Sequence, residues 1–422
     1  MTKSFAELNL RPEVLAALDA AGFDKPFPIQ EMVIPIAITG VDLIGQAKTG
    51  TGKTLGFGLP IVNNVKPTGK IQALVVVPTR ELGVQVAAEL EKIGTDLSVA
   101  AIYGGRAFEP QLAQLKEGVD ILVATPGRLL DLHRQKEVDL TTVKQLVLDE
   151  ADEMLDLGFL PDVEKIFSLT QNRTQTMLFS ATMPGDVMVL ARKYLNQPTH
   201  IRTQEEDSGA VVKNVSQFVY RTHALDKAEI VARILQAEGR GQTMIFCRTK
   251  RTCQQLADNL KERGFKSAAI HGDLGQPARE RALADFKSNK RDVLVATDVA
   301  ARGIDIDGIT HVINYQCPED EKTYLHRIGR TARAGASGIA VTFVDWDELP
   351  RWSHINQSLE LGIADPVETY SSSEHLFSDL KIAKEVKSTL PKAQSEHRKS
   401  PERPTRVKRE RKRTKKSSLE KQ

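Results

Sequence analysis

The sequence predicts an α/β protein built from two tandem parallel-sheet domains and a disordered basic C-terminal tail. Its 422 residues exceed what one ordinary core accommodates. Short apolar runs alternate with amphipathic segments, a pattern typical of parallel sheets covered by helices. We expect buried strands at residues 72–77, 144–148 and 292–296, and a helix at residues 81–93.

Short motifs of the first half recur in the second half at nearly constant spacing. The segment LVAT occurs at residues 122–125 and again at 294–297, an offset of 172 residues. The segment VVVPTR at 75–80 is echoed by IFCRTK at 245–250, an offset of 170. A repeat of this length is too long for a solenoid unit and predicts a duplicated domain.

The chain divides where its composition changes. A polar, acidic stretch at residues 204–213 predicts a linker between a first domain at 1–203 and a second domain at 214–365. Residues 366–422 form a C-terminal extension. From about residue 385 it is rich in Lys, Arg, Ser and Pro and has no aromatic residue, so this tail cannot bury enough apolar surface to fold alone.

A net charge of +3 hides a strong asymmetry between the body and the tail. Residues 381–422 hold 16 Lys and Arg against 5 Asp and Glu, whereas the first 380 residues hold 42 against 50. An acidic body with a basic tail suggests contact with a polyanion. The overall composition, 27% charged and 41% apolar, excludes a collagen-like, disulfide-scaffold or wholly disordered chain.

The sequence shows no targeting or membrane signal. The first ten residues lack the basic segment and apolar run of a secretory signal, and no apolar run approaches the span of a bilayer. Cys247, Cys253 and Cys317 form no CxxC pair, which disfavours a disulfide framework or a zinc site. We expect reduced thiols, a cytoplasmic location and no membrane partner.

Residues 47–54 read AKTGTGKT and predict a phosphate-binding loop between a strand and a helix. Gly50 and Gly52 let successive backbone N–H groups point at phosphate oxygens. Lys53 reaches the β and γ phosphates, and the Thr54 hydroxyl is placed to ligate Mg²⁺. The strict pattern has Gly where Ala47 stands. The candidate nucleotide-binding residues here are Ala47, Lys48, Thr49, Gly50, Thr51, Gly52, Lys53 and Thr54.

Two carboxylates follow the predicted strand at residues 144–148. Asp149 comes directly after the apolar run, which places it at the carboxyl edge of a parallel sheet, where such sheets bind ligands. We expect Asp149 to hold Mg²⁺ through water. Glu150 is the candidate to orient and deprotonate the attacking water.

Residues 149–152 spell DEAD, and over about residues 5–344 the sequence resembles the DEAD-box family of ATP-dependent RNA helicases. The resemblance implies two RecA-like domains facing each other across a cleft, with ATP and Mg²⁺ as cofactors. It also implies that Gln30 reads the adenine edge, that Phe23 stacks on the adenine ring and that Asp305 lies near the ribose.

Two further motifs imply coupling between ATP and domain closure. Ser180 and Thr182 are similar to the family's SAT motif, whose hydroxyls bond to the DEAD carboxylates, Asp152 among them. Residues 326–335, HRIGRTARAG, resemble a motif in which His326 takes part in coupling and Arg330 and Arg333 are arginine fingers. Spaced by three, the two arginines would share one face of a helix. The family usually has Gly where Ala332 stands.

Short loops after strands in both domains resemble the family's RNA-binding motifs. Their N–H, hydroxyl and guanidinium groups suit phosphate and 2′-OH oxygens, which fixes the register of a single strand without reading its base sequence. The implied residues are Pro78, Thr79, Arg80, Gly105, Thr125 and Arg128 in the first domain and Thr249, Gln276, Arg279, Thr297, Arg302 and Gly303 in the second.

The basic tail has three interpretations. Residues 406–416, RVKRERKRTKK, should bind nucleic acid non-specifically by counterion release, with strong salt dependence. A solubilising tail and a nuclear-import signal stay open as alternatives.

The resemblance implies an ATP-dependent RNA helicase, an RNA-stimulated ATPase that locally unwinds short duplexes or remodels RNA–protein complexes. Two alternatives are an ATP-gated RNA clamp that turns over little and a double-stranded DNA translocase. The short N-terminal lead-in and single basic tail look like bacterial members, which act in ribosome assembly or RNA decay. Ribosomal particles and the RNA-decay machinery are therefore candidate partners, although the motifs do not fix the RNA client.

Overall fold

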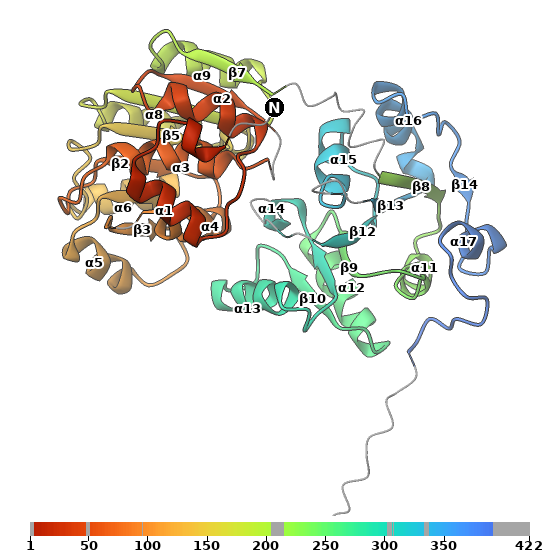
Figure 1. The fold of residues 1–422 in the computed structure, drawn as a ribbon. Coiled ribbons are helices and arrows are strands. Elements are labelled where there is room, and N and C mark those ends of the chain that lie inside the picture. The colour runs from red at the N-terminus through yellow and green to blue at the C-terminus, as the bar shows by residue number, and fades with distance from the viewer. Residues whose placement is uncertain are drawn as a thin grey trace, which may run out of the picture.

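The chain forms two domains, each built around one parallel sheet with helices packed against it (Figure 1). The computed structural model describes residues 4–47, 51–94, 96–203, 215–301, 306, 308–332 and 337–390. The predicted α/β class with two tandem parallel-sheet domains is confirmed. The predicted linker at 204–213 and the tail beyond residue 390 lie outside the described residues.

The first domain contains a seven-stranded sheet with the strand order β3-β4-β2-β5-β6-β1-β7. Its elements are η1 (Phe5–Glu7), α1 (Pro12–Ala20), α2 (Pro28–Ala37), β1 (Leu43–Gln46), α3 (Lys53–Asn64), β2 (Ala73–Val76), α4 (Arg80–Ile93), β3 (Val99–Ile102), α5 (Phe108–Glu117), β4 (Ile121–Ala124), α6 (Pro126–Arg134), β5 (Gln145–Leu148), α7 (Ala151–Asp156), α8 (Leu160–Leu169), β6 (Gln175–Ser180), α9 (Gly185–Tyr194) and β7 (Thr199–Arg202).

The second domain contains a seven-stranded sheet with the order β10-β11-β9-β12-β13-β8-β14. Its elements are β8 (Val215–Arg221), α11 (Lys227–Ile234), β9 (Gln242–Phe246), α12 (Lys250–Glu262), β10 (Ser267–Ile270), α13 (Gln276–Lys287), β11 (Val293–Ala296), α14 (Asp298–Ala301), β12 (Ile309–Asn314), α15 (Glu321–Ile328), β13 (Gly338–Val344), η3 (Trp346–Glu348), α16 (Leu349–Ser358), β14 (Val367–Glu368) and α17 (Glu374–Asp379).

The two strand orders are the same when the strands are matched in sequence, so the predicted duplication is confirmed. The repeated motifs occupy equivalent places. The LVA of each LVAT segment lies on β4 or β11 with the Thr directly after it, and VVVPTR and IFCRTK begin on the last two residues of β2 and β9. Thr79 and Thr249, which are equivalent in this repeat, both cap the next helix by accepting a backbone hydrogen bond.

The predicted buried strands and the predicted helix are confirmed as β2, β5, β11 and α4. Side chains along each strand alternate between the two faces of the sheet, and both faces are covered by apolar clusters. Along β2, Ala73 and Val75 belong to one apolar cluster, while Leu74 and Val76 belong to a second cluster on the opposite face. Parallel strands in register bring the loops after β1, β5 and β6 to one edge of the first sheet. That edge carries the phosphate loop, the DEAD residues and the SAT residues.

The C-terminal extension predicted from residue 366 is divided by the structure. Residues through Leu390 pack on the second domain, since β14 pairs with β8 and the side chains of Leu376, Leu380 and Ile382 enter its core. Leu390 itself donates its N–H to the carbonyl of Arg263. The second domain therefore extends past the predicted boundary at residue 365, because Leu376 and Ile382, which lie beyond that boundary, are part of its apolar core.

The three cysteines lie in the interior of the second domain. Cys247, Cys253 and Cys317 are free and buried, and burial raises the pKa of the Cys253 thiol to about 12, so it stays protonated at neutral pH. Across the described ranges, no helix combines the length and the apolar character that a membrane crossing requires.

Candidate ATP and RNA site

The phosphate loop lies between β1 and α3, where Gly52 begins the turn into the helix. Gly52 has a φ of +81°, a conformation that favours glycine, and a Cβ there would come 2.3 Å from Gln30 Nε2. Ala47, which stands where the strict pattern has its first Gly, donates its N–H to the carbonyl of Ser180 at the end of β6. Lys48, Thr49 and Gly50 lie outside the described residues.

Lys53 supplies a buried positive charge at this loop. It is the first residue of α3 and is 7% exposed, and its buried Nζ has no hydrogen-bond partner among the residues that the structure describes. A buried ammonium without a partner is costly. The observation fits a site whose anion, such as a nucleotide phosphate, completes the hydrogen bonds. Thr54 follows it on the first turn of the helix.

Gln30 connects the upstream motif to the phosphate loop. Its side chain is fully buried, with Nε2 donating to the Gly52 carbonyl at 2.8 Å and Oε1 accepting from the Phe27 N–H at 2.9 Å. Phe23 is half-buried against the core. In this arrangement the Gln30 amide holds the loop rather than facing an open space, and adenine recognition by Gln30 and Phe23 stays a prediction.

Asp149, which is buried, and Glu150, which is half-buried, form an acidic pair at the end of β5. The Glu150 N–H donates to Asp149 Oδ1 at 3.0 Å. Burial raises the pKa of Asp149 to about 6, against the opposing charge of Lys53. Burial also raises the pKa of Glu150 to about 7, opposed by Lys53 and by Arg330 of the other domain. A carboxyl with a pKa near neutrality is suited to accept a proton from water.

Glu150 also adopts a strained backbone conformation. Its φ of +52° and ψ of +52° lie in the left-handed region, which is unfavourable for a residue with a long side chain. Such strain persists only where the surroundings enforce it, and it concentrates at functional sites. The turn at Glu150 directs the chain from β5 into α7.

Asp152 connects the DEAD residues to the SAT residues. Its Oδ2 accepts from the Thr182 N–H at 2.9 Å and from the Thr182 hydroxyl at 2.6 Å, and its N–H donates to Ser180 Oγ at 3.3 Å. Burial alone would raise the pKa of Asp152, but the hydrogen bonds from Thr182 and Ser180 outweigh it and lower this pKa. The predicted hydroxyl contact with a DEAD carboxylate is therefore present at Thr182.

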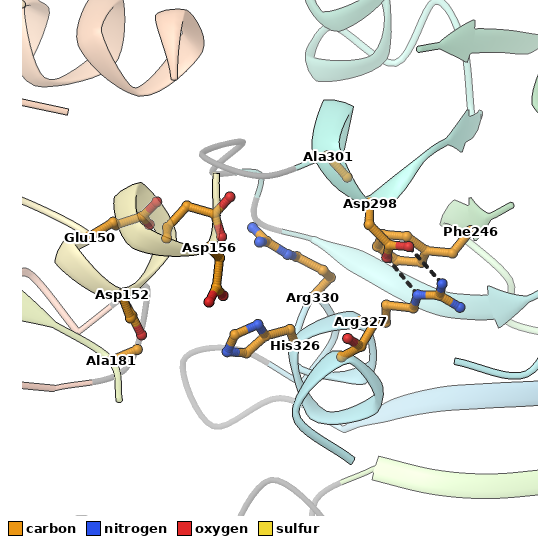
Figure 2. Close-up of a pocket in the computed structure, with 12 residues that line it drawn as sticks. Glu150, Asp152, Asp156, Ala181, Phe246, Asp298, Ala301, His326, Arg327 and Arg330 are labelled. Carbon is orange, nitrogen blue, oxygen red and sulfur yellow. Dashed lines mark hydrogen bonds and ion pairs between the residues drawn. The ribbon is translucent and has the colours of Figure 1, made fainter. Parts of the chain in front are cut away.

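A pocket between the two domains brings these groups together with the second domain (Figure 2). Figure 2 shows Arg330 and His326 pointing from the second domain toward Glu150 and Asp156 of the first. Lys322 Nζ spans the cleft and pairs with Asp156 Oδ2 at 3.1 Å. The lining residues are Glu150, Asp152, Glu153, Asp156, Ala181, Phe246, Asp298, Ala301, Thr323, His326, Arg327 and Arg330.

The expectation that Arg330 and Arg333 share a helix face is wrong for Arg330. Helix α15 ends at Ile328, because Gly329 caps it and Ala332 then turns into the left-handed region at a φ of +56°. Ala332 therefore adopts a glycine-like conformation at the position where the family usually has Gly. Arg333 and Asp305 lie outside the described residues.

The sequence interpretation missed the residues that position this arginine segment. Arg327 is 2% exposed and holds Asp298 with two bonds, Nε to Oδ1 at 2.6 Å and Nη2 to Oδ2 at 2.7 Å. Its Nη1 also donates to Asn314 Oδ1 at 3.2 Å. The signal available was weak: an arginine beside His326 reads equally as one more basic residue.

The predicted RNA residues of the two domains meet across the cleft. Arg80 Nη1 donates to Gln276 Oε1 at 3.1 Å, and Arg279 Nη2 pairs with Glu81 Oε1 at 3.0 Å. Arg106, which follows the Gly104-Gly105 pair and was not predicted, pairs with Glu280 at 2.8 Å. The start of α4 and the loop after β3 in the first domain thus face α13 of the second domain across the cleft, where a strand contacting both domains would lie.

Other predicted RNA residues hold their own loops. Arg128 is 7% exposed, stacks 4.0 Å from the Phe108 ring centroid and donates to the Arg106 carbonyl at 3.0 Å. Gly105 has a φ of +81° and leaves no room for a side chain beside Arg80. Pro78 and Thr297 are buried at strand ends, and Thr125 begins α6 as its cap residue. Arg302 and Gly303 lie outside the described residues.

The acidic groups suit a metal that arrives with a nucleotide. Within the described part of the chain, no group of three or more His, Cys, Asp or Glu side chains could hold a metal by itself. Mg²⁺ is commonly held by one or two carboxylates together with phosphate oxygens and water. Asp149 and Thr54 would supply one carboxylate and one hydroxyl toward that set.

Comparisons with known proteins agree with this architecture. A model of the DEAD/DEAH box helicase family matches residues 27–190, and a model of the helicase conserved C-terminal domain matches residues 226–335. The chain is 44% identical over 347 residues to the DEAD-box ATP-dependent RNA helicase CshA of Bacillus subtilis, covering 82% of this chain and 70% of that protein. It is 43% identical over 364 residues to the DEAD-box ATP-dependent RNA helicase RhpA of Helicobacter pylori, covering 85% and 74%.

Solved structures show the same fold. The structure of Dbp5 from S. cerevisiae bound to RNA and ADP BeF3 is similar with a TM-score of 0.76 and 30% identity, covering 90% of this chain and 98% of that one. The structure of Mss116p bound to ssRNA and AMP-PNP has a TM-score of 0.76 and 27% identity, covering 90% and 82%.

Proposed function

This chain belongs to the DEAD/DEAH box helicase family and is an ATP-dependent RNA helicase, and on that premise we propose that it separates short RNA duplexes locally and remodels RNA–protein complexes. The observation that carries the proposal is the pocket between the domains. It joins Glu150 and Asp152 of the first domain to His326 and Arg330 of the second.

In the proposed reaction, ATP binds the first domain and the second completes the site. The Lys53 ammonium takes the phosphates as its missing partners. Asp149 and Thr54 would hold Mg²⁺, and a bound Mg²⁺ would neutralise charge on the phosphates. Glu150 takes the proton of the attacking water, since its pKa of about 7 leaves a large share of the carboxylate ionised at neutral pH. Arg330, with Arg333, stabilises the charge that develops on the γ phosphate.

RNA binding and ATP binding are coupled through closure of the cleft. The Asp152–Thr182 contact connects the DEAD turn to the strand end that faces the second domain. RNA held by Arg80, Thr79, Gly105 and Thr249 on both domains favours the closed arrangement that also aligns Arg330. By linkage, ATP tightens RNA binding by the same factor as RNA tightens ATP binding.

The finer assignments rest on the sequence resemblance. We propose that Gln30 and Phe23 contact the adenine, Asp305 the ribose, and Lys48, Thr49, Gly50, Thr51 and Gly52 the phosphates. The remaining strand contacts are Pro78, Thr125, Arg128, Gln276, Arg279, Thr297, Arg302 and Gly303. The tail adds a salt-sensitive tether to RNA. We place the protein in the cytoplasm, in ribosome assembly or RNA decay.

Two assays test the proposal. ATP hydrolysis should rise on addition of single-stranded RNA but not of DNA of the same sequence, and a short RNA duplex should be separated over many turnovers. Stimulation by duplex DNA alone would support a translocase instead. A long-lived RNA complex with ATP and little unwinding would support the clamp, which needs the same residues. RNA crosslinked to the protein in cells and sequenced would identify the client.

A further inference from the structure

The second domain exposes an aromatic surface away from the ATP pocket. Trp346 is 58% exposed, Val367 is 57% exposed and Tyr370 is 47% exposed. These side chains come from η3, from the edge strand β14 and from the segment that follows it. Figure 1 shows β14, α16 and α17 together on the flank of the second domain that faces away from the first. We call the surface formed by Arg221, Trp346, Asp347, Asp365, Val367, Glu368 and Tyr370 the edge surface.

The edge surface is continuous through side-chain contacts. The Arg221 guanidinium lies 4.3 Å from the Trp346 ring centroid. Arg221 also pairs with Glu368 at 3.4 Å and with Asp365 at 3.6 Å. The Tyr370 hydroxyl donates to Glu368 Oε1 at 2.8 Å. Trp346 therefore already stacks with one guanidinium while much of its ring stays open to solvent.

Acidic side chains dominate the edge surface. The Asp365 side chain is 89% exposed, the Glu368 side chain is 43% exposed, and Asp347 is exposed beside Trp346. Only Arg221 opposes these three carboxylates within the surface. Open aromatic rings among carboxylates suit a ligand rich in Arg and Lys, through cation–π contacts and ion pairs. The same charges repel a nucleic acid.

We propose that the edge surface docks the basic tail of this same chain, residues 406–416. The tail follows Leu390, which packs on the same domain. The 16 residues from Leu390 to Arg406 reach about 50 Å when extended, at about 3.3 Å per residue. That reach exceeds the diameter of about 40 Å expected for a domain of this size. Tethering also raises the effective concentration of the tail at this surface to roughly millimolar.

Docking would make RNA and the edge surface compete reversibly for the tail. The Lys and Arg side chains that fit the edge surface are the ones that contact phosphates when RNA is present, so one set of cations serves two anionic partners. RNA binding should release the tail from the edge surface, and salt should weaken both contacts. This inference extends the proposed tether, but it does not depend on helicase activity.

Tryptophan fluorescence tests the proposal directly. The chain has two tryptophans, and Trp352 is fully buried, so quenching by acrylamide reports on Trp346. At low salt the full chain should be quenched at most half as strongly as the chain truncated after Leu390. The double variant Asp347→Lys/Asp365→Lys of the full chain should be quenched like the truncated chain. The matched variant Glu117→Lys/Glu137→Lys, with the same charge change on the exposed surface of the first domain, should keep the shielding.

A second measurement keeps the result independent of any effect of truncation on folding. A fluorescent peptide of residues 391–422 should bind the truncated chain, and Asp347→Lys/Asp365→Lys should weaken it at least tenfold. Equal quenching in the full and truncated chains, or no peptide binding, would overturn the proposal. Shielding that grows with protein concentration would assign the edge surface to a second copy. Shielding of Trp346 by RNA in the truncated chain would assign it to nucleic acid, and either outcome also overturns the proposal.

Discussion

The two sheets have the same strand order, but equivalent lysines at their carboxyl edges have opposite surroundings. In the first domain Lys53 begins α3 after β1, and its buried Nζ has no hydrogen-bond partner within the described ranges of the chain. In the second domain Lys227 begins α11 after β8, is 2% exposed, and donates to Asp345 Oδ2 at 2.5 Å and to the Tyr315 carbonyl at 3.1 Å. One lysine can take a phosphate partner, whereas the other already has a carboxylate.

The loops that follow the central strands of the two sheets also differ in their carboxylates. β5 is followed by Asp149 and Glu150, whereas its counterpart β12 is followed by Tyr315 and Gln316, which carry no carboxylate. The second domain instead contributes His326 from α15 and Arg330 from just after it to the pocket. We therefore propose that, after duplication of one fold, the first copy binds nucleotide at Lys53 while the second copy, whose lysine is already paired with Asp345, completes the site.

Removal of Arg330 should have the largest effect on this division of roles. Arg330→Ala should lower kcat for RNA-stimulated ATP hydrolysis about 10³-fold or more, because an arginine finger acts on transition-state charge. ATP affinity, measured by a fluorescent analogue, should change little. Arg192→Ala, an exposed arginine of the first domain, is the control and should leave both unchanged. A loss of ATP affinity with kcat preserved would contradict the assignment.

The two lysines give the next test. Lys53→Met should weaken ATP binding by up to about 10²-fold, because hydrogen bonds to charged groups contribute about 1.5–3 kcal/mol. Lys227→Met should leave ATP affinity unchanged and lower the melting temperature instead, because it leaves Asp345 without its buried partner. Titration calorimetry and thermal unfolding separate the two effects. Loss of ATP binding in Lys227→Met would break the comparison.

The pH dependence of hydrolysis should follow Glu150. Its carboxyl must be ionised to accept a proton, and a pKa of about 7 means that the ionised fraction falls as the pH drops through neutrality. The RNA-stimulated rate at saturating ATP should fall about tenfold between pH 8 and pH 6, in proportion to that fraction. The residual rate of Glu150→Gln should lack this dependence. A wild-type rate that stays flat over the range would argue against Glu150 as the base.

The contacts across the RNA side of the cleft should have the smallest effect. Arg106 and Glu280 form an exposed pair, for which about 0.2–1 kcal/mol is expected. Glu280→Gln frees Arg106 for RNA, so the affinity for single-stranded RNA without nucleotide should rise by up to about fivefold. Glu117→Gln is the control. Weaker RNA binding in Glu280→Gln, measured by fluorescence anisotropy, would show that the pair supports the RNA site rather than competing with it.

Much of the fold followed from the sequence because its signals are local. The apolar runs at β2, β5 and β11 and the echoes of LVAT and VVVPTR were visible as short stretches of sequence. So were the placement of Lys53 at the start of a helix after a strand and that of Asp149 at a strand end. Contacts between residues far apart in the sequence could not be predicted, because no local pattern identifies the partner. The turn that ends α15 before Arg330, the Arg327–Asp298 pair and the Arg106–Glu280 pair are set by residues from 29 to 174 positions apart or by backbone strain at Ala332.

We propose that Glu150 activates water for ATP held at the first sheet. Single-turnover hydrolysis of ATP prebound with single-stranded RNA to Glu150→Gln isolates this step. The variant should bind ATP and RNA as the wild type does, while its hydrolysis rate falls about 10²–10⁴-fold. Hydrolysis at a rate close to that of the wild type, with both ligands bound, would rule out Glu150 as the base.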